Sequence, residues 1–243
     1  MIDCYRKITK EQRIFMSILN VEHLSHGFGD RAIFQDVSFR LLKGEHIGLI
    51  GANGEGKSTF MSIITGKLQP DEGKIEWAKN VRVGYLDQHT ELKKGMTVRE
   101  TLASAFAFLF DLEEQMNQMY DKMADATEEE MASYMEETGL IQELLSAHDF
   151  YMIDAKVEEV GRALGLAEVG LDRDVTELSG GQRTKVLLGK LLLEKPDILL
   201  LDEPTNYLDV EHIEWLKRYL NDYENAFILI SHDIPFLTSV VNL

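Results

Sequence analysis

Three short apolar runs place the tightest limit on how this chain can fold. The runs IGLI (47–50), DILLLD (197–202) and AFILIS (226–231) are almost continuously apolar. Such runs are typical of strands that are buried on both faces of a parallel sheet. Further strand-like runs, separated by helical patterns, occupy residues 18–24, 36–42 and 81–86. We therefore expect an α/β fold built on a parallel sheet.

Composition narrows the class of protein. The chain has 243 residues, 44% of them hydrophobic, which is enough for a sizeable core. Its net charge of −17 argues against broad binding of nucleic acid, because neutralising phosphates requires Lys and Arg. The single cysteine, Cys4, rules out an internal disulfide framework. With no apolar run long enough for a membrane span and no signal-peptide pattern, we expect a cytoplasmic location.

The middle of the chain has a different character. From Thr97 to about Gly165 only helical patterns occur, and two Thr-x-x-Glu capping boxes, at 97–100 and 127–130, begin helices there. Residues 111–149 hold twelve acids and one base, Lys122. This acid-rich stretch fits either a solvated charged face or a protruding arm that meets a partner, and the two are compatible. We expect four segments: a disordered extension or short native tail (1–15), the first part of the core (16–96), a helical subdomain with the acidic arm (97–177), and the remainder of the core (178–243).

The string GANGEGKST at 51–59 has the pattern of a phosphate-binding loop between a strand and a helix. Its glycines let the backbone wrap round a phosphate chain, and its N–H groups and the helix start attract negative charge. Lys57 should reach the β- and γ-phosphates, and the Ser58 hydroxyl should bind Mg²⁺. A glycine-rich turn with a surface lysine is the simpler alternative for this string taken alone.

A buried strand, ILLLDEP, ends in Asp202 and Glu203. Carboxylates at the C-terminal edge of a parallel sheet face the ligand crevice. Asp202 is therefore expected to hold Mg²⁺ and Glu203 to act as the general base that activates water. The presence of the phosphate loop makes an ordinary acidic strand end a weak alternative.

Taken together, these motifs resemble those of ATP-binding cassette ATPases. The resemblance covers about residues 17–243 and rests on the Walker A loop (51–58), LSGGQ (178–182), the Walker B strand with its following glutamate (198–203) and ILISHD with His232. It implies a P-loop NTPase core that uses ATP and Mg²⁺ and carries an inserted helical subdomain. In such ATPases two cassettes face each other, and LSGGQ of one closes over the ATP of the other.

The resemblance also implies a role for each motif residue. Phe28 would stack on adenine, Gln88 would lie near Mg²⁺ and the attacking water, and His232 would contact the γ-phosphate. Catalytic roles thus fall to Glu203, His232 and Gln88, and metal roles to Ser58, Gln88 and Asp202. The implied nucleotide-binding residues are Phe28, Gly51, Asn53, Gly54, Gly56, Lys57, Ser58, Thr59, Ser179, Gly180, Gly181, Gln182 and Asp209.

Two features resemble the soluble ABC-F subfamily more than transporter subunits. DEPTNYLD (202–209) is similar to that subfamily's motif, and Gln88 and Leu178 lie 90 residues apart, which leaves room for an inserted arm. This resemblance implies action on the ribosome and translation, or ribosome protection against antibiotics. Members normally carry two cassettes and a basic linker. Because this chain ends at Leu243, soon after His232, we expect a first cassette truncated after that histidine, completed by a second cassette.

Other kinds of cassette protein remain alternatives. The main one is the ATP-binding subunit of an ABC transporter, which a neighbouring permease gene would favour. A non-catalytic regulatory cassette is disfavoured by the intact Lys57, Asp202 and Glu203. A DNA-repair cassette is disfavoured by the absence of zinc-type cysteine spacing in the sequence.

Overall fold

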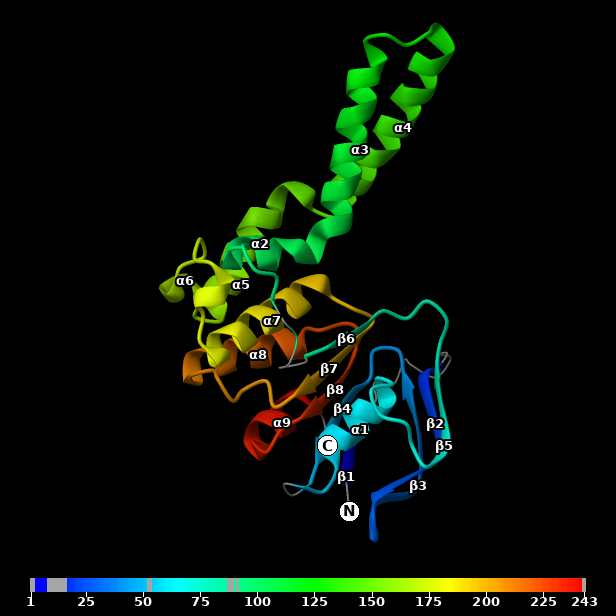
Figure 1. The fold of residues 1–243 in the computed structure, drawn as a ribbon, viewed down its shortest axis with the longest axis vertical. Coiled ribbons are helices and arrows are strands. Elements are labelled where there is room, and N and C mark those ends of the chain that lie inside the picture. Colours follow the sequence, from blue (N-terminus) through cyan, green and yellow to red (C-terminus); the bar gives the residue numbers. More distant parts are fainter. Residues whose placement is uncertain (1–2, 8–16, 52–53, 87–89, 91, 242–243) are drawn as a thin grey trace. The chain divides into compact units, whose positions relative to one another are not determined.

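A computed structural model describes residues 3–7, 17–51, 54–86, 90 and 92–241. The chain forms two compact units (Figure 1). Unit 1 comprises residues 1–90 and 195–243, and unit 2 comprises residues 91–194. This division differs from the expected segments, because 178–194 belongs to the helical unit. Close helix packing inside unit 2 explains the difference: a Cβ added at Gly189 would lie 2.9 Å from Leu102 Cδ2.

A five-stranded sheet forms the centre of unit 1, with the strand order β1-β4-β8-β7-β6. The strands β4 (His46–Ile50), β8 (Ala226–Ile230), β7 (Ile198–Asp202) and β6 (Val83–Tyr85) run parallel. Every residue of β8 is buried, as are the first four of β7 and of β4. The prediction of a parallel α/β sheet from continuous apolar runs is therefore confirmed.

The first strand of this sheet was not predicted. Residues Asp3–Lys7 form β1, which pairs antiparallel with β4 from Asp3↔Ile50 to Lys7↔His46. The expectation of a disordered extension is wrong for these residues. The edge of β4 presents unpaired N–H and C=O groups, and a short segment can satisfy them without any apolar run of its own. Residues 1–2 and 8–15 of the expected extension lie outside the described residues.

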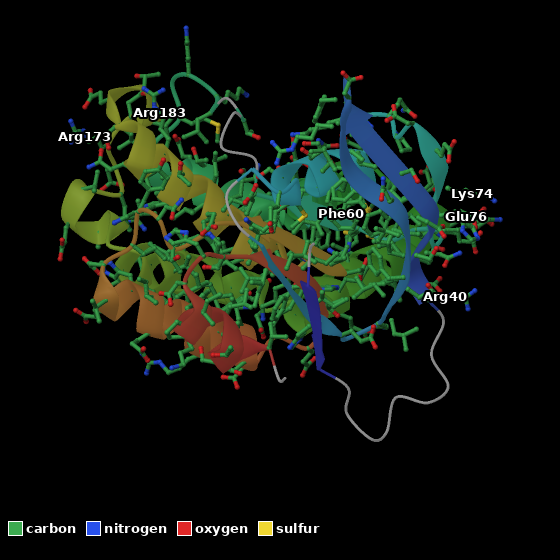
Figure 2. The ribbon with its side chains drawn as sticks, turned by 90° about the horizontal axis from the view of Figure 1, so that it is seen from below. Arg40, Phe60, Lys74, Glu76, Arg173 and Arg183 are labelled. Carbon is green, nitrogen blue, oxygen red and sulfur yellow. The ribbon has the colours of Figure 1, made fainter. Side chains whose placement is uncertain are left out.

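A second, antiparallel sheet in unit 1 has the order β3-β2-β5. Strands β2 (Ser17–Phe28) and β3 (Arg31–Leu42) form a long hairpin, and β5 (Glu72–Trp77) pairs with the other edge of β2. The sequence pattern missed β5 because the PDEG turn at 70–73 runs directly into it. Its outward residues are charged, with Lys74 Nζ 2.6 Å from Glu76 Oε1 (Figure 2).

Three helices complete the described part of unit 1. They are α1 (Lys57–Ile64), α8 (Val210–Asn221) and α9 (Ile234–Val240). Helix α1 places Phe60 in the core, where its ring lies 6.0 Å from that of Phe34 and 5.6 Å from that of Phe39 (Figure 2). Helix α9 packs closely on β4, since a Cβ at Gly48 would lie 2.8 Å from Leu237 Cδ2. These contacts pack α1 against β3 and α9 against β4, and the loops that follow β4 and β8 carry the candidate site.

Every secondary-structure element longer than an isolated β-bridge among the described residues of unit 2 is helical, as predicted for 97–165. Both capping boxes are formed: Thr97 and Glu100 cap α2, and Thr127 and Glu130 cap α4. No helix in the described parts of the chain is both long and apolar enough to cross a membrane. The helices and 3-10 turns are α2 (Val98–Ala103), η1 (Ser104–Phe106), α3 (Ala107–Met123), α4 (Glu128–Ala147), η2 (Phe150–Met152), α5 (Ile153–Ala163), α6 (Leu166–Val169), η3 (Val175–Glu177) and α7 (Gly180–Glu194).

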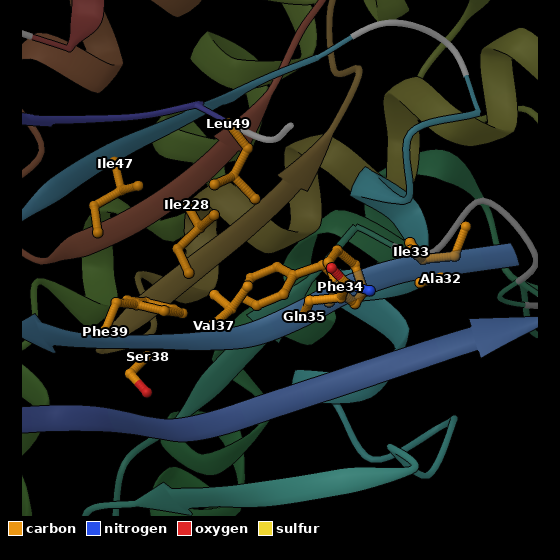
Figure 3. A pocket seen from close by; sticks show the side chains of 11 residues that line it. Ala32, Ile33, Phe34, Gln35, Val37, Ser38, Phe39, Ile47, Leu49 and Ile228 are labelled. Atoms are coloured by element: carbon orange, nitrogen blue, oxygen red, sulfur yellow. The ribbon is translucent and has the colours of Figure 1, made fainter.

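An apolar cavity of about 620 Å³ lies in unit 1 between β3 and the strands β4 and β8 (Figure 3). Phe34, Phe39, Ile47 and Ile228 are among the side chains that line it. Gln35 and Ser38 are the polar residues of its lining. With so few polar groups, this cavity offers no chemistry for phosphate or for proton transfer.

Candidate nucleotide site

A second pocket, of about 360 Å³, gathers most of the predicted site residues of unit 1. Four chain segments meet there: the tip of the β2–β3 hairpin, the loop between β4 and α1 with the first turn of that helix, the end of β7 and the end of β8. Because β4 and β7 are both hydrogen-bonded to β8, their carboxyl ends open on one edge of the sheet. The pocket is lined by Phe28, Arg31, Ile33, Gly54, Gly56, Lys57, Ser58, Thr59, Asp202, Glu203 and Ile230.

The loop before α1 depends on glycine at position 56. Gly56 is the N-cap of α1 and has a φ of 96°, a conformation that L side chains rarely adopt. A Cβ there would lie 2.1 Å from Ile33 Cγ2. The loop therefore closes against β3 only with glycine at its last position, which leaves the first N–H groups of α1 pointing into the pocket.

Lys57 is folded back into the loop. Its side chain is buried, and Nζ donates a hydrogen bond of 2.6 Å to the carbonyl oxygen of Gly51. This contact holds the ammonium group beside the first N–H groups of the helix, where an incoming phosphate would meet it. Gly51 thus contributes through its carbonyl group. Asn53, a further predicted loop residue, lies outside the described residues.

Ser58 and Asp202 supply oxygen ligands to the pocket from α1 and β7. A hydroxyl and a carboxylate are hard donors of the kind that Mg²⁺ takes, usually together with waters and substrate phosphates. No cluster of three or more His, Cys, Asp or Glu side chains suited to a metal occurs among the described residues. The donor set therefore fits a Mg²⁺ ion that arrives with a nucleotide, and it does not resemble a site that holds a metal alone.

Glu203, the residue after β7, is held in an uncommon backbone conformation. Its φ is 48°, in the left-handed region where non-glycine residues are rare. Its N–H donates to the carbonyl oxygen of Ile230 at 2.9 Å, which continues the β7–β8 pairing by one residue. Strain of this kind persists where the surrounding structure demands it, and it is concentrated at functional sites.

The carboxylate of Glu203 contacts His232, which lies just beyond β8. Oε2 is 2.7 Å from the ring Nδ1 and accepts a second hydrogen bond, of 3.2 Å, from the His232 backbone N–H. The Glu203 side chain is 17% exposed and that of His232 is 65% exposed. Glu203, the predicted general base, is thus largely buried. His232, the predicted contact to the γ-phosphate, lies beside it and is open to solvent.

Asp209 has a structural role in the described chain and does not line the pocket. It is the N-cap of α8, where its side chain accepts from the His212 N–H. The His212 ring also lies close, with Nδ1 2.5 Å from Asp209 Oδ1. The nucleotide role of Asp209 therefore remains a prediction.

Gln88 lies outside the described residues, so its predicted catalytic and metal roles also remain predictions.

Phe28 lies at the mouth of the pocket and is 56% exposed. It pairs across the hairpin with Arg31, so both side chains leave the ribbon on the same face. The Arg31 guanidinium donates to the Gly54 carbonyl at 3.2 Å and so reaches from the hairpin to the phosphate loop. Sequence reasoning missed Arg31. The sequence feature that could have indicated it is the position of this cation, directly after the turn that follows Phe28.

The LSGGQ residues lie in unit 2, at the start of α7. The Ser179 N–H donates to Gln182 Oε1 at 2.9 Å, and the Gln182 N–H donates to Ser179 Oγ at 3.3 Å. These two bonds form a capping box. A Cβ added at Gly180 would meet nothing within 4 Å, so the helix start is open on that side. The predicted roles of Ser179, Gly180, Gly181 and Gln182 toward a nucleotide are untested.

Comparison with known proteins identifies the class of this site. The ABC transporter family profile matches residues 34–206. The protein named "Uncharacterized ABC transporter ATP-binding protein YfmM", from Bacillus subtilis, is 73% identical over 228 residues, which are 94% of this chain and 44% of that protein. "ABC transporter F family member 2" of Arabidopsis thaliana is 37% identical, over 90% of this chain and 32% of the relative.

Two further matches agree with this result. "Energy-dependent translational throttle protein EttA" of Escherichia coli K12 is 37% identical, over 86% of this chain and 37% of the relative. The solved structure titled "RNase-L Inhibitor" has a TM-score of 0.64 and 26% identity, over 94% of this chain and 36% of that one. The chain thus spans less than half the length of each of these relatives. It belongs to the ABC transporter family and is an ATP-binding cassette.

Proposed function

We propose that this chain binds and hydrolyses MgATP as a cassette of the ABC-F type, completed by a second cassette, and that it acts in the cytoplasm on the ribosome or on translation. The observation that carries the enzymatic part is the contact between Glu203 and His232 at the edge of the pocket that holds Lys57 and Ser58. A base, a phosphate-binding loop and oxygen ligands for Mg²⁺ meet there.

In this proposal each part of the pocket binds one part of the nucleotide. Phe28 stacks on the adenine ring, and the N–H groups of the loop and of the first turn of α1 bind the phosphates. Lys57 exchanges the Gly51 carbonyl for the β- and γ-phosphates. Ser58 and Asp202 would hold Mg²⁺, which neutralises phosphate charge when it is bound.

Glu203 then acts as the general base on the attacking water. Its Oε2 is engaged by His232, so the proton from water passes to Oε1. His232 orients the carboxylate through two donors and turns its exposed ring edge toward the γ-phosphate. Gln88 is proposed to lie near Mg²⁺ and the same water.

The second cassette supplies the other half of each site. The start of α7 is open at Gly180 and carries the dipole of a 15-residue helix, both of which favour an anion. The proposed anion is the γ-phosphate of ATP held by a facing cassette, with Ser179, Gly181 and Gln182 around it. Asp209 would lie at the boundary between the two cassettes.

Two observations support the ABC-F role: the identity to the F family member and to the translational throttle protein, and the helical pair α3 and α4 inserted before the signature. The alternative, an ATP-binding subunit of a transporter, is supported by the printed name of the 73% identical relative. Sedimentation separates the two. The Glu203→Gln chain, loaded with ATP, should travel with purified ribosomes through a sucrose gradient, and with ADP it should stay at the top.

Recovery of the chain with a membrane permease, and not with ribosomes, would contradict the ABC-F proposal. ATP hydrolysis is tested independently, by phosphate release from the wild-type chain over a series of protein concentrations. The Glu203→Gln variant serves as the inactive reference in that measurement.

A further inference from the structure

A buried histidine stands directly behind the exposed ring of Phe28. His26 is only 7% exposed, and neither of its ring nitrogens has a hydrogen-bond partner among the residues that the structure describes. Its ring meets that of Phe28 edge to face, with centroids 5.0 Å apart and an angle of 85°. Buried polar atoms without partners are rare in proteins, so this placement calls for a reason.

The carboxylate of Asp71 lies beside this histidine. Its Oδ2 lies 3.3 Å from His26 Nδ1, although the two are not aligned for a hydrogen bond. The same oxygen accepts from the Gly27 N–H at 2.8 Å, and the Asp71 N–H donates to the Ser25 carbonyl at 3.1 Å. Asp71, in the turn before β5, therefore holds β2 on both sides of His26.

This clamp acts where the pairing of β2 with β3 is irregular. The β2–β3 register shifts between Leu24 and His26 and again between His26 and Gly27. The ladder alone therefore does not fix the direction in which Phe28 leaves the strand. Gly27 adds a steric condition, since a Cβ there would lie 2.7 Å from the Arg31 carbonyl oxygen. The hairpin tip closes only with glycine at 27, and the Gly27 N–H then needs an acceptor from outside the hairpin.

We infer that Asp71 and His26 are positioning residues for the adenine-binding face of the pocket: Asp71 anchors the backbone at Gly27, and the His26 ring supports the Phe28 ring against which adenine stacks. The inference rests on the proposed binding of ATP and deepens it. It gives the turn at 70–73 a role in recognising the base, separate from the loop that binds the phosphates.

The test separates the base from the phosphates with two probes, MgATP and Mg-tripolyphosphate, titrated calorimetrically into the full chain. Asp71→Ala should weaken ATP binding about threefold to tenfold, a fraction of the effect expected when base stacking is lost altogether. Tripolyphosphate binding should not change, because Asp71 does not line the pocket. Asp71→Asn keeps an oxygen that accepts from Gly27 and should restore most of the ATP affinity.

Two further variants make the test specific. Glu72→Ala removes an equal charge from the neighbouring exposed position and should bind both probes as wild type does. In a Phe28→Ala background, Asp71→Ala should have no additional effect, since the ring that it positions is gone. Unfolding temperatures of all variants establish that each is folded.

Three results would overturn the inference: unchanged ATP affinity in Asp71→Ala, an equal loss of affinity for both probes, or an undiminished effect in the Phe28→Ala background. Failure of the proposed function looks different. In that case the wild-type chain itself binds no ATP, or binds ATP no more tightly than tripolyphosphate. Such a result would contradict both the proposed binding of ATP and this inference.

Discussion

The carboxylate of Glu203 holds His232 by two contacts, 2.7 Å to the ring Nδ1 and 3.2 Å to the backbone N–H. The two residues follow the neighbouring parallel strands β7 and β8, and they lie 29 positions apart in sequence. Because both donors reach the same oxygen, His232 fixes the orientation of the carboxylate. Glu203 is therefore presented to the pocket with Oε1 as its working oxygen.

Replacing Glu203 by Gln should preserve ATP binding and lower steady-state phosphate release by about 10²- to 10⁴-fold, the usual contribution of a general base. The amide keeps the shape of the side chain but cannot take a proton from water. Phosphate release and calorimetric binding of ATP check the two halves of this prediction. Glu224→Gln, at an exposed position outside the pocket, is the control and should hydrolyse ATP as wild type does. Unchanged turnover in Glu203→Gln would remove this residue from its proposed role.

Replacing Lys57 by Ala should weaken MgATP binding about 10- to 100-fold, the range expected for lost hydrogen bonds to charged groups. The ammonium group lies inside the phosphate loop, 2.6 Å from the Gly51 carbonyl. Titration with a fluorescent ATP analogue measures the change. The exposed Lys43, outside the pocket, provides a charge-matched control in Lys43→Ala. Equal affinity for Lys57→Ala and wild type would refute the assignment of the loop.

Arg31→Ala should weaken ATP binding about threefold to tenfold, less than Lys57→Ala, because solvent screens an exposed cation. Arg31 lies between Phe28 and Gly54, and thus between the proposed positions of the base and the phosphates. Calorimetry compares it with Arg40→Ala on the same strand. Arg40 bonds Asn20 and does not line the pocket. A larger effect from Arg40→Ala than from Arg31→Ala would contradict this placement.

Two inactive variants should restore activity when they are mixed. Lys57→Ala damages the phosphate loop, and Ser179→Arg blocks the signature at the start of α7. If the signature acts on a facing cassette, a mixed pair holds one site with both lesions and one site with neither. Phosphate release should then reappear on mixing, and wild-type activity per chain should rise with protein concentration. Absence of rescue, with crosslinking that shows mixed pairs, would mean that the signature acts within its own chain.

Deleting residues 111–149 should leave ATP binding within about twofold of wild type, because unit 1 contains the whole described pocket. Phe110 and Phe150 flank the deleted segment, and their ring centroids lie 5.3 Å apart. A short Gly-Ser bridge can therefore join the two chain ends. Ribosome sedimentation should be lost in the same variant. Loss of ATP binding in a variant that keeps its circular dichroism spectrum would contradict a separate binding role for α3 and α4.

Local patterns were sufficient for several features. The capping boxes at Thr97 and Thr127 form as predicted, because each needs only hydrogen bonds within four consecutive residues. The strands β7 and β8 could be predicted because burial on both faces requires a continuous apolar run. The phosphate loop could be recognised because Gly56 must adopt a conformation that other residues avoid.

Other features depend on residues far apart in sequence, and no local period encodes them. The pairing of β1 with β4, the reach of Arg31 to Gly54 and the contact of Asp71 with Gly27 arise from how strands and turns meet in space. His26 illustrates the reason. In the sequence it is one polar residue in an alternating strand, and only the packing of the hairpin against the turn at 70–73 buries it behind Phe28. Burial and long-range contact depend on the order of the strands, which is a property of the whole fold.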